Sequence, residues 1–344
     1  MQNCDIETRS PKWDILKFFL VFLVVLGHAA SFYTETSYFM KGLFLLIYSF
    51  HMPLFIFISG MFSKRNIDEK RYNKIFGYLI VYFALKLFEF FYKLLSGANP
   101  EFSVFSEGGA PWYMFALFSF SLITIAVKKV SPKYVLIMSI LLACVAGYDS
   151  DIGDFLVLSR TIVFFPFFYL GYCLDRKKTE NFCRSRTNKI VVAAVLISFI
   201  AIVFVFADGI DFLRPLLTGR NPFSKLGKYA DFGFFIRLLY YAVVTLVSAC
   251  VVILTPQKTH FGIAERLGQR TLAVYGLHYI VFYFMFVRFD VKPVLDEHLG
   301  MFSSLIPIIL SVLLTLFFSL NIFNDILTKI MNVPLRKRIT DFNS

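Results

Sequence analysis

The sequence predicts an all-α membrane protein, a polytopic bundle of about ten transmembrane helices. Hydrophobic residues make up 58% of its 344 residues and charged residues only 17%, whereas a soluble domain has about 45–50% and about 25%. The mean hydropathy is +0.68, and apolar runs recur along the whole chain. Because only helices and closed barrels satisfy their backbone in lipid, each long apolar run predicts a helix.

The apolar runs give the predicted helices in order, and the fifth run is the shortest. The helices are expected at residues 15–33, 38–62, 74–95, 111–127, 134–147, 156–174, 189–208, 235–255, 271–287 and 302–322. The polar segments between these runs are too short for a separate soluble domain. Residues 1–344 are therefore expected to form a single transmembrane domain.

The distribution of Lys and Arg predicts how the bundle is oriented. Residues 63–74, 128–133 and 175–189 are rich in them, whereas residues 97–110 and 148–155 contain none. Because cytoplasmic loops collect positive charge, both termini are expected in the cytoplasm. The net charge of +12 therefore reflects orientation, and no basic segment is long enough to form a reader of nucleic acid.

One predicted external segment, residues 209–234, does not follow this charge rule. It carries Arg214, Arg220, Asn221, Lys225, Lys228 and Asp231. Either it is an ordinary solvated loop, or it is an external surface that meets a polar or anionic partner.

The first predicted helix carries three ionisable residues near one face. His28 follows Lys17 by eleven residues, which is three turns and about 20° more, and Asp14 lies about 40° from the same face. Asp14 and Lys17 are three residues apart and can form an ion pair. Lys17 either extends to the inner interface or supports a site. His28 is either a hydrogen-bonded interhelical residue or a proton-transfer group, since imidazole titrates near neutral pH.

The second predicted helix places His51 beside a proline. Pro53 cannot donate to the carbonyl of Ser49, so a free acceptor and a kink are expected there. Ser59 and Gly60 allow a neighbouring helix or a ligand to come close. His28 and His51 each lie roughly 16 Å above the inner end of their helices, so both are expected near the bilayer centre.

The third predicted helix has Lys86, Glu89 and Lys93 on one face. They form either a structural cluster of paired charges or part of a site. Arg71 and Lys74 lie at its cytoplasmic start, where they either anchor the helix or bind an anionic ligand such as a nucleotide phosphate.

His278 lies in the ninth predicted helix and has either a structural or a functional role. Together with His28 and His51 it suggests a reaction chamber or a proton path. The histidines form no recognisable metal motif, and no metal is expected. The five cysteines have neither disulfide nor metal spacing and are expected to be small hydrophobic residues; they are Cys4, Cys144, Cys173, Cys183 and Cys250.

Two motifs are more specific than the rest. Residues 14–28 read Asp-Ile-x-Lys-x10-His, and residues 49–60 read Ser-Phe-His-Met-Pro-Leu-Phe-x-Phe-x-Ser-Gly. With them the chain resembles the acyltransferase-3 family of membrane acyltransferases, and in particular its branch of fucose-4-O-acetylase-like sugar O-acetyltransferases. Weaker landmarks follow at residues 111–114, 170–172 and 275–278.

The sequence differs from the family pattern at two basic positions. Lys17 stands where the family commonly has Arg, and Lys74 stands where the second Arg of an Arg-x-x-Arg pair is often found. Lys lacks the planar fork of Arg, so bidentate binding is not expected at either position.

The resemblance implies a fold and an activity. It implies ten spans in an inner or plasma membrane, with both termini in the cytoplasm. It also implies transfer of an acetyl or other acyl group from cytoplasmic acyl-CoA, such as acetyl-CoA, to a sugar hydroxyl. The acceptor would be a surface polysaccharide or its lipid-linked precursor.

The resemblance also implies roles for individual residues. His28 would act either as general base for the acceptor hydroxyl or as a group that handles the acyl unit directly, with His51 completing the chamber. Asp14 and Lys17 would support this face, Lys17 could also help hold the donor, and the basic pair Arg71 and Lys74 would bind the CoA phosphates. Further candidates for the chamber are Lys86, Glu89, His278 and Ser59.

Two other functions remain open at this stage. A transporter of a glycan or small solute would also use buried charges and a proline-kinked helix, although the sequence has no repeated half. A non-catalytic partner in the cell envelope would tolerate loss of His28 and His51. Release of thiol from acyl-CoA separates an enzyme from both.

Overall fold

A computed structural model describes residues 10–103, 105, 109–185, 188–258 and 262–333. The predicted all-α architecture is confirmed, because the described residues form helices and turns and include no strand. The first six helices are α1 (Pro11–Ser31), α2 (Tyr38–Asp68), α3 (Tyr72–Leu95), α4 (Trp112–Val127), α5 (Pro132–Ala146) and α6 (Leu158–Cys173).

The second half of the chain alternates long and short helices. It contains α7 (Arg176–Ser185), α8 (Lys189–Val205), α9 (Ala207–Ile210), η1 (Asp211–Leu213), α10 (Arg214–Leu217), η2 (Phe223–Phe232), α11 (Gly233–Leu254), α12 (Ile263–Leu267), α13 (Thr271–Phe282), the π-helix η3 (Tyr283–Arg288), α14 (Lys292–Leu299), η4 (Gly300–Ser304), α15 (Leu305–Phe318) and α16 (Asn321–Met331).

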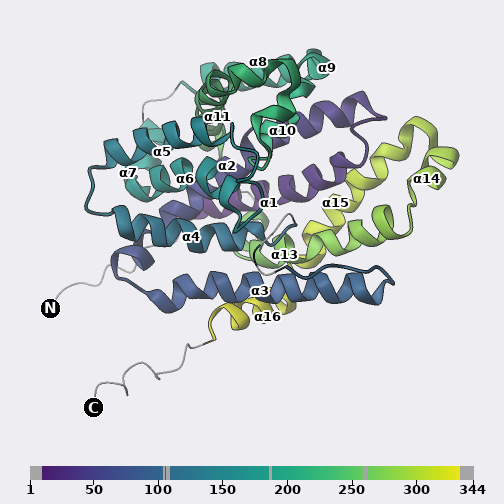
Figure 1. Cartoon of the computed structure of the whole chain (residues 1–344), viewed down its shortest axis with the longest axis horizontal. Coiled ribbons are helices and arrows are strands. Elements are labelled where there is room, and N and C mark those ends of the chain that lie inside the picture. The colour runs from purple at the N-terminus through teal and green to yellow at the C-terminus, as the bar shows by residue number, and fades with distance from the viewer. Residues whose placement is uncertain (1–9, 104, 106–108, 186–187, 259–261, 334–344) are drawn as a thin grey trace.

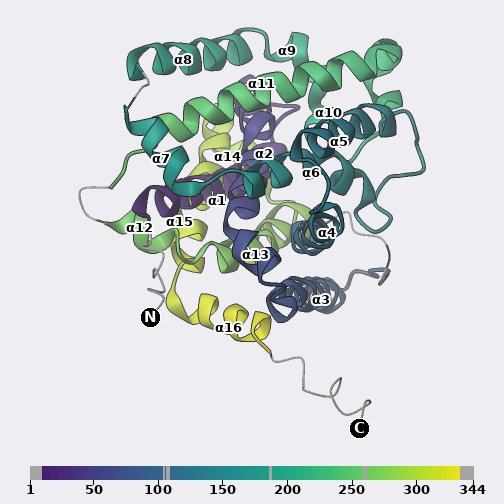
Figure 2. The same ribbon diagram turned by 90° about the vertical axis from the view of Figure 1, so that its left-hand side faces the viewer.

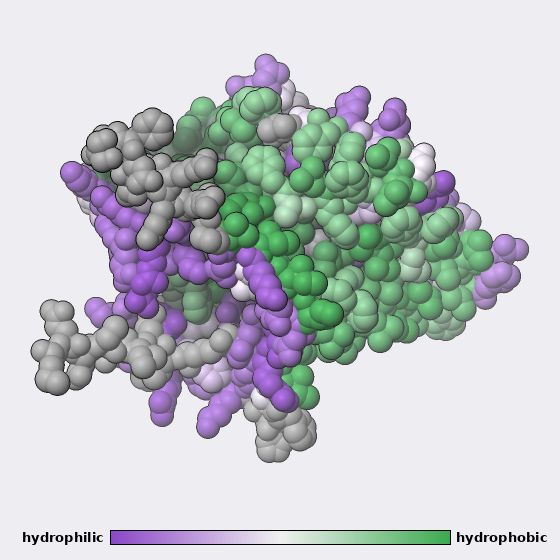
Figure 3. Space-filling model, turned by 90° about the horizontal axis from the view of Figure 1, so that it is seen from below, coloured by the Kyte–Doolittle hydropathy of each residue, from purple (hydrophilic) through white to green (hydrophobic). Residues whose placement is uncertain are grey.

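The long helices run side by side, and α1 lies inside the bundle against α2, α13 and α15 (Figure 1). Figure 2 looks at the end where α1 begins, and shows α7, α12 and α16 lying at this end. Polar side chains gather there, at the left of Figure 3, while apolar side chains cover most of the remaining surface in this view. A broad apolar surface is what a lipid-facing bundle requires.

Local sequence determines where several helices begin. Pro11 and Pro132 occupy the first turns of α1 and α5, where the missing N–H has no intrahelical acceptor. The side chain of Ser37 accepts a hydrogen bond from the backbone N–H of Met40 and caps α2. Asn188 caps α8 in the same way.

Helices α2 and α6 meet at two glycines. A Cβ atom on Gly60 would lie 2.0 Å from the carbonyl oxygen of Phe168, and one on Gly171 would lie 1.9 Å from the carbonyl oxygen of Phe57. Each helix therefore places a glycine against the backbone of the other, as in small-residue contacts of membrane helices. The close approach predicted at Gly60 is confirmed.

Every predicted span coincides with an apolar helix, but the helices differ in length. Among the described residues, six helical stretches are long and apolar enough to cross a membrane, and a seventh follows if α7 and α8 form one bent span. Helices α4, α5 and α6 are shorter apolar helices. The polytopic membrane fold is confirmed, whereas ten full crossings remain a prediction.

Two segment predictions were wrong in detail. The span expected at 302–322 ends at Phe318, because Leu320 is extended and a separate helix, α16, begins at Asn321. Residues 209–234, for which a solvated loop was one of two alternatives, contain short helices on both sides of a turn at 218–222. Arg214 stabilises this segment through bonds to Asp211 and Glu35. Cys4 lies outside the described residues.

Candidate active site

A cavity of about 490 Å³, here called the chamber, lies among α1, α2, α3, α4, α6 and α13. Its volume is in the range of small-molecule sites. The wall is completed by Gly109 and Ala110 before α4, by Leu217 at the end of α10, and by Thr218, Arg220 and Asn221 after it. The chamber lies toward the C-terminal end of α1, because His28 and Ser31 line it. The chamber is thus a polar space inside an apolar bundle.

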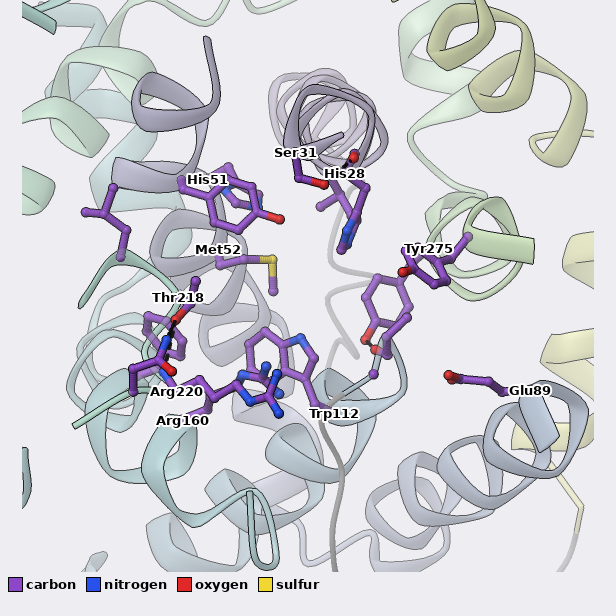
Figure 4. A pocket seen from close by; sticks show the side chains of 18 of the residues that line it. His28, Ser31, His51, Met52, Glu89, Trp112, Arg160, Thr218, Arg220 and Tyr275 are labelled. Carbon is purple, nitrogen blue, oxygen red and sulfur yellow. Dashed lines mark hydrogen bonds between the residues drawn. The ribbon is translucent and has the colours of Figure 1, made fainter. Parts of the chain in front are cut away.

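His28 lies on the wall of the chamber, near the C-terminal end of α1 (Figure 4). Its ring packs edge-on against Tyr279, with ring centroids 5.4 Å apart. His51 of α2 lines the same chamber. The structure therefore brings these two predicted histidines to one cavity.

The third predicted histidine, His278, packs against the His28 ring and is not itself one of the residues that line the chamber. Its ring centroid is 5.2 Å from that of His28, and the residue is fully buried. The Nδ1–H of His278 donates to the carbonyl of Val274 at 2.8 Å, because only a protonated nitrogen can bond a carbonyl oxygen. Its Nε2 has no hydrogen-bond partner within the described part of the chain. The lone pair of this nitrogen is therefore available beside His28.

The tautomer of His51 is determined in the same way. Its Nδ1–H donates to the carbonyl of Ile47 at 2.7 Å, which leaves Nε2 as the acceptor nitrogen. The ring of Tyr48 packs edge-on against His51 at 5.0 Å and also lines the chamber. His51 can therefore accept a hydrogen bond from a ligand hydroxyl.

The charges predicted on the third helix divide between two environments. Glu89 and Lys93 line the chamber and form an ion pair of 2.6 Å. Lys86 is buried elsewhere on α3, where its Nζ donates to the hydroxyl of Tyr82 at 3.1 Å. Only part of the predicted charge cluster therefore belongs to the chamber.

Three residues that were not predicted to belong to the chamber form one side of it. Trp112, Arg160 and Arg220 lie next to one another, and Glu89 lies across the cavity from them (Figure 4). We call these three residues the arginine wall. The Arg160 guanidinium lies over the Trp112 ring, 4.8 Å from its centroid, as in cation–π contacts.

Tyr275 fixes the start of α4 beside the chamber. Its hydroxyl donates to the carbonyl of Ala110 and accepts a hydrogen bond of 3.2 Å from the backbone N–H of Tyr113. One side chain of α13 thus holds the segment that positions Trp112. The weak landmarks at residues 111–114 and 275–278 therefore meet in space.

Lys17 and Asp14 lie at the other end of α1 and form the predicted ion pair, of 2.7 Å. The Lys17 ammonium lies over the ring of Phe62 at 4.8 Å, and the Arg176 guanidinium approaches the same ring at 5.5 Å. Eleven residues of helix separate Lys17 from His28, or about 16 Å. Lys17 and Asp14 therefore lie apart from the chamber.

The remaining candidates also lie outside the chamber. The Ser59 hydroxyl shares a hydrogen bond of 2.6 Å with that of Tyr113 and lies behind the chamber wall. The Lys74 ammonium donates to the side chain of Asn332 at 2.6 Å. Among the described residues, no group of three His, Cys, Asp or Glu side chains has a geometry suited to a metal ion.

Arg71 lies in the short turn between α2 and α3 and pairs with Glu69 at 2.5 Å. Hydrogen bonds from Arg65 and then Arg71 lower the pKa of Glu69 below its ordinary value. Glu69 is therefore ionised at neutral pH, and an anionic ligand at Arg71 has to compete with it.

Comparison with known families identifies the chain. A family model for an acyltransferase domain matches residues 11–323. The chain belongs to the acyltransferase-3 family. The match includes every residue that lines the chamber. The protein is therefore a membrane acyltransferase, as the resemblance implied.

One curated relative of this acyltransferase is Nodulation protein NolL of Sinorhizobium fredii (strain NBRC 101917 / NGR234). The two are 28% identical over 194 residues, which cover 51% of this chain and 51% of NolL. The chain thus matches about half the length of this relative. No solved structure matches the acyltransferase.

The arrangement gathers histidine, arginine and carboxylate side chains around one cavity of this acyltransferase. His28 and His51 supply basic nitrogens, and the arginine wall supplies positive charge. Sequence reasoning missed Arg160, which lies in the sixth apolar run, and named Arg220 only as part of the external segment 209–234. A charged residue inside the sixth apolar run was the available signal for Arg160.

Proposed function

We propose that the protein is an O-acyltransferase that moves an acetyl or other acyl group from acyl-CoA to a sugar hydroxyl. The acceptor is a surface polysaccharide or its lipid-linked precursor. The observation that carries the proposal is the position of His28, which lies on the wall of a polar chamber within the membrane bundle. The family implies acyl transfer, and this transfer needs a base for the acceptor proton.

The proposed reaction is a single displacement. His28 removes the proton of the acceptor hydroxyl, whose oxygen attacks the thioester carbonyl carbon. The new C–O bond forms as the C–S bond breaks, and His28 returns its proton to the leaving thiolate sulfur. The His278 ring packs beside that of His28, with ring centroids 5.2 Å apart. The chamber holds both reactants together, which lowers the barrier through proximity.

The proposed donor route begins at the opposite, cytoplasmic end. Arg71 and Lys74 bind the CoA phosphates there, and Lys17 with Arg176 lies nearer the start of α1. The flexible arm of the donor then bridges the roughly 16 Å between Lys17 and His28. The distribution of Lys and Arg supports this orientation, with both termini in the cytoplasm of a cell with an inner or plasma membrane.

The proposed function predicts a base-labile acetyl group on a glycan. The gene is expressed in hosts that make defined surface glycans, and the O-acetyl content is measured by NMR before and after mild base. In parallel, purified protein is given acetyl-CoA with the same glycans, and free thiol is measured. Thiol release that depends on one glycan supports the proposal, whereas its absence with every glycan contradicts it.

Loss of the basic pair is expected to weaken donor binding. Arg71→Gln combined with Lys74→Gln should raise the KM for acetyl-CoA about tenfold with little change in kcat, because each charge-assisted bond to phosphate contributes to binding. Steady-state kinetics at low and high salt measure the effect, which should shrink at high salt.

Lys133→Gln provides the control for this prediction, because it removes an exposed positive charge from the start of α5. It should leave the KM for acetyl-CoA unchanged. Equal effects of the control and the double variant would mean that Arg71 and Lys74 only contribute to the general surface potential.

A further inference from the structure

Two tyrosine hydroxyls at the chamber have no hydrogen bond within the described part of the chain. Tyr48 of α2 and Tyr279 of α13 both line the cavity, and no described residue donates to or accepts from either hydroxyl. Neither oxygen is enclosed by protein atoms, and both side chains are partly exposed. A phenolic O–H in this position can donate its hydrogen to a bound ligand.

The other hydroxyl groups that line the chamber already donate within the protein. The Ser31 hydroxyl donates to the carbonyl of His28 at 2.6 Å. The Tyr275 hydroxyl donates to the carbonyl of Ala110, and the Thr218 hydroxyl donates to a backbone carbonyl three residues earlier at 2.8 Å. Among the described lining residues, the two tyrosines are therefore the hydroxyls that stay available for a reacting group.

Tyr279 stands beside the proposed base. Its ring packs edge-on against that of His28, with ring centroids 5.4 Å apart, and the ring of His278 packs against it at 6.5 Å. These aromatic contacts restrict the orientation of the tyrosine. An acyl group that is attacked at His28 therefore comes within reach of the Tyr279 side chain.

A glycine brings Tyr48 to the same part of α1. A Cβ atom on Gly27 would lie 3.0 Å from a carbon of the Tyr48 ring, so this ring lies directly against the helix backbone. Phe44 stacks on the Tyr48 ring with centroids 4.0 Å apart, and His51 packs edge-on against it at 5.0 Å. The two tyrosines thus contact α1 at consecutive residues, 27 and 28.

The proposed reaction requires hydrogen-bond donors as well as a base. When the acceptor oxygen attacks the thioester carbonyl carbon, an electron pair of the C=O bond moves onto the carbonyl oxygen. Donors fixed in place before the reaction stabilise this developing oxyanion, and tyrosine hydroxyls are among the groups that serve in this role. His51 is not such a donor, because its Nδ1–H is bonded to the carbonyl of Ile47 and its Nε2 is an acceptor.

We propose that the hydroxyls of Tyr48 and Tyr279 donate hydrogen bonds to the thioester carbonyl oxygen as it becomes negatively charged. The inference rests on the proposed function and names the groups that stabilise its transition state. Both tyrosines keep their protons. The proton of the acceptor passes to His28 and then to the leaving thiolate sulfur, and the electron pair on the oxygen re-forms the carbonyl as the C–S bond breaks.

Removal of either hydroxyl is expected to slow acyl transfer selectively. Tyr48→Phe and Tyr279→Phe each keep the ring and delete one oxygen. Each variant should lower kcat by about 10²–10³-fold, the usual effect of losing one oxyanion donor. The KM values for acetyl-CoA and for the acceptor glycan should stay near those of the wild type, because the hydrogen bond strengthens in the transition state. Steady-state release of thiol by the purified full chain measures both quantities.

Tyr240→Phe is the matched control, because it makes the same chemical change outside the chamber. The Tyr240 hydroxyl is buried and has no hydrogen-bond partner within the described ranges, and the residue is not one of those that line the chamber. This variant should keep the wild-type kcat. Thermal unfolding in detergent shows which variants are folded. If one chamber variant does not fold, the other tests the proposal by itself.

The pH dependence of kcat/KM separates a hydrogen-bond donor from a base. Both chamber variants should lose activity at low pH with the same midpoint as the wild type, since His28 remains the base. A shifted midpoint would assign the tyrosines to proton transfer and overturn the inference. A wild-type kcat in both folded variants, or a change in KM alone, would overturn it as well. Absence of transfer by the wild-type protein would contradict the proposed function instead, so the two failures are distinguishable.

Discussion

Replacing His28 by alanine is expected to lower the rate of acyl transfer by about 10²–10⁴-fold, the usual contribution of a positioned general base. The side chain lies on the chamber wall against Tyr279 and His278. Among the described residues that line the chamber, the other imidazole is that of His51, which comes from a different helix. The rate of thiol release from acetyl-CoA in the presence of the acceptor measures the loss.

The matched control is His298→Ala, since His298 is an exposed histidine of α14. It should transfer acyl groups at the wild-type rate. Thermal unfolding in the same detergent tests whether the His28→Ala protein remains folded. A folded His28→Ala variant with wild-type activity would exclude His28 as the base, and the same measurement on His51→Ala would then identify the alternative.

The largest effect on stability is expected at the contact between α2 and α6. Gly171→Ala should lower the free energy of unfolding by about 3 kcal/mol or more, at the upper end of overpacking effects. The new methyl group would lie 1.9 Å from the Phe57 carbonyl oxygen, and a backbone atom cannot rotate away as a side chain can. The helices must therefore separate, which loses their close packing.

Gly209→Ala is the control for this prediction, because a Cβ atom there meets nothing within 4 Å. Its unfolding free energy should change by no more than about 1 kcal/mol. Thermal unfolding followed by circular dichroism compares the two variants. If both unfold at the same temperature, α2 and α6 do not make this contact in the membrane protein.

Much of the fold could be predicted because the chain is so apolar. Composition and hydropathy located every apolar helix, since a spanning segment needs a long apolar run. Two features were missed for a physical reason. Helix α16 and the short helices at 207–232 are partly polar, so their periodicity does not stand out beside the apolar spans. Their positions depend on contacts between segments far apart in the chain.

The candidate site was predicted in part. His28 and His51 were found because an ionisable residue in an apolar run is costly and conspicuous. The sequence predicted that His28 and His51 lie at a similar depth and that His278 lies near them. In the structure His28 and His51 line one chamber, and the His278 ring packs against that of His28. The sequence could not show that Glu89 lines the chamber while Lys86 lies outside it. Residues three apart on a helix lie near one face but can still contact different neighbouring residues.

Helices α4, α5 and α6 have 16, 15 and 16 residues, or about 22–24 Å of helix. The hydrocarbon layer of a bilayer is about 30 Å thick. If these helices cross the bilayer as predicted, the lipids beside them have to thin to match the shorter helices. Under the proposed function, a thinned bilayer would shorten the path between an acyl donor on one side and a glycan on the other, so the rate of acyl transfer is expected to depend on membrane thickness.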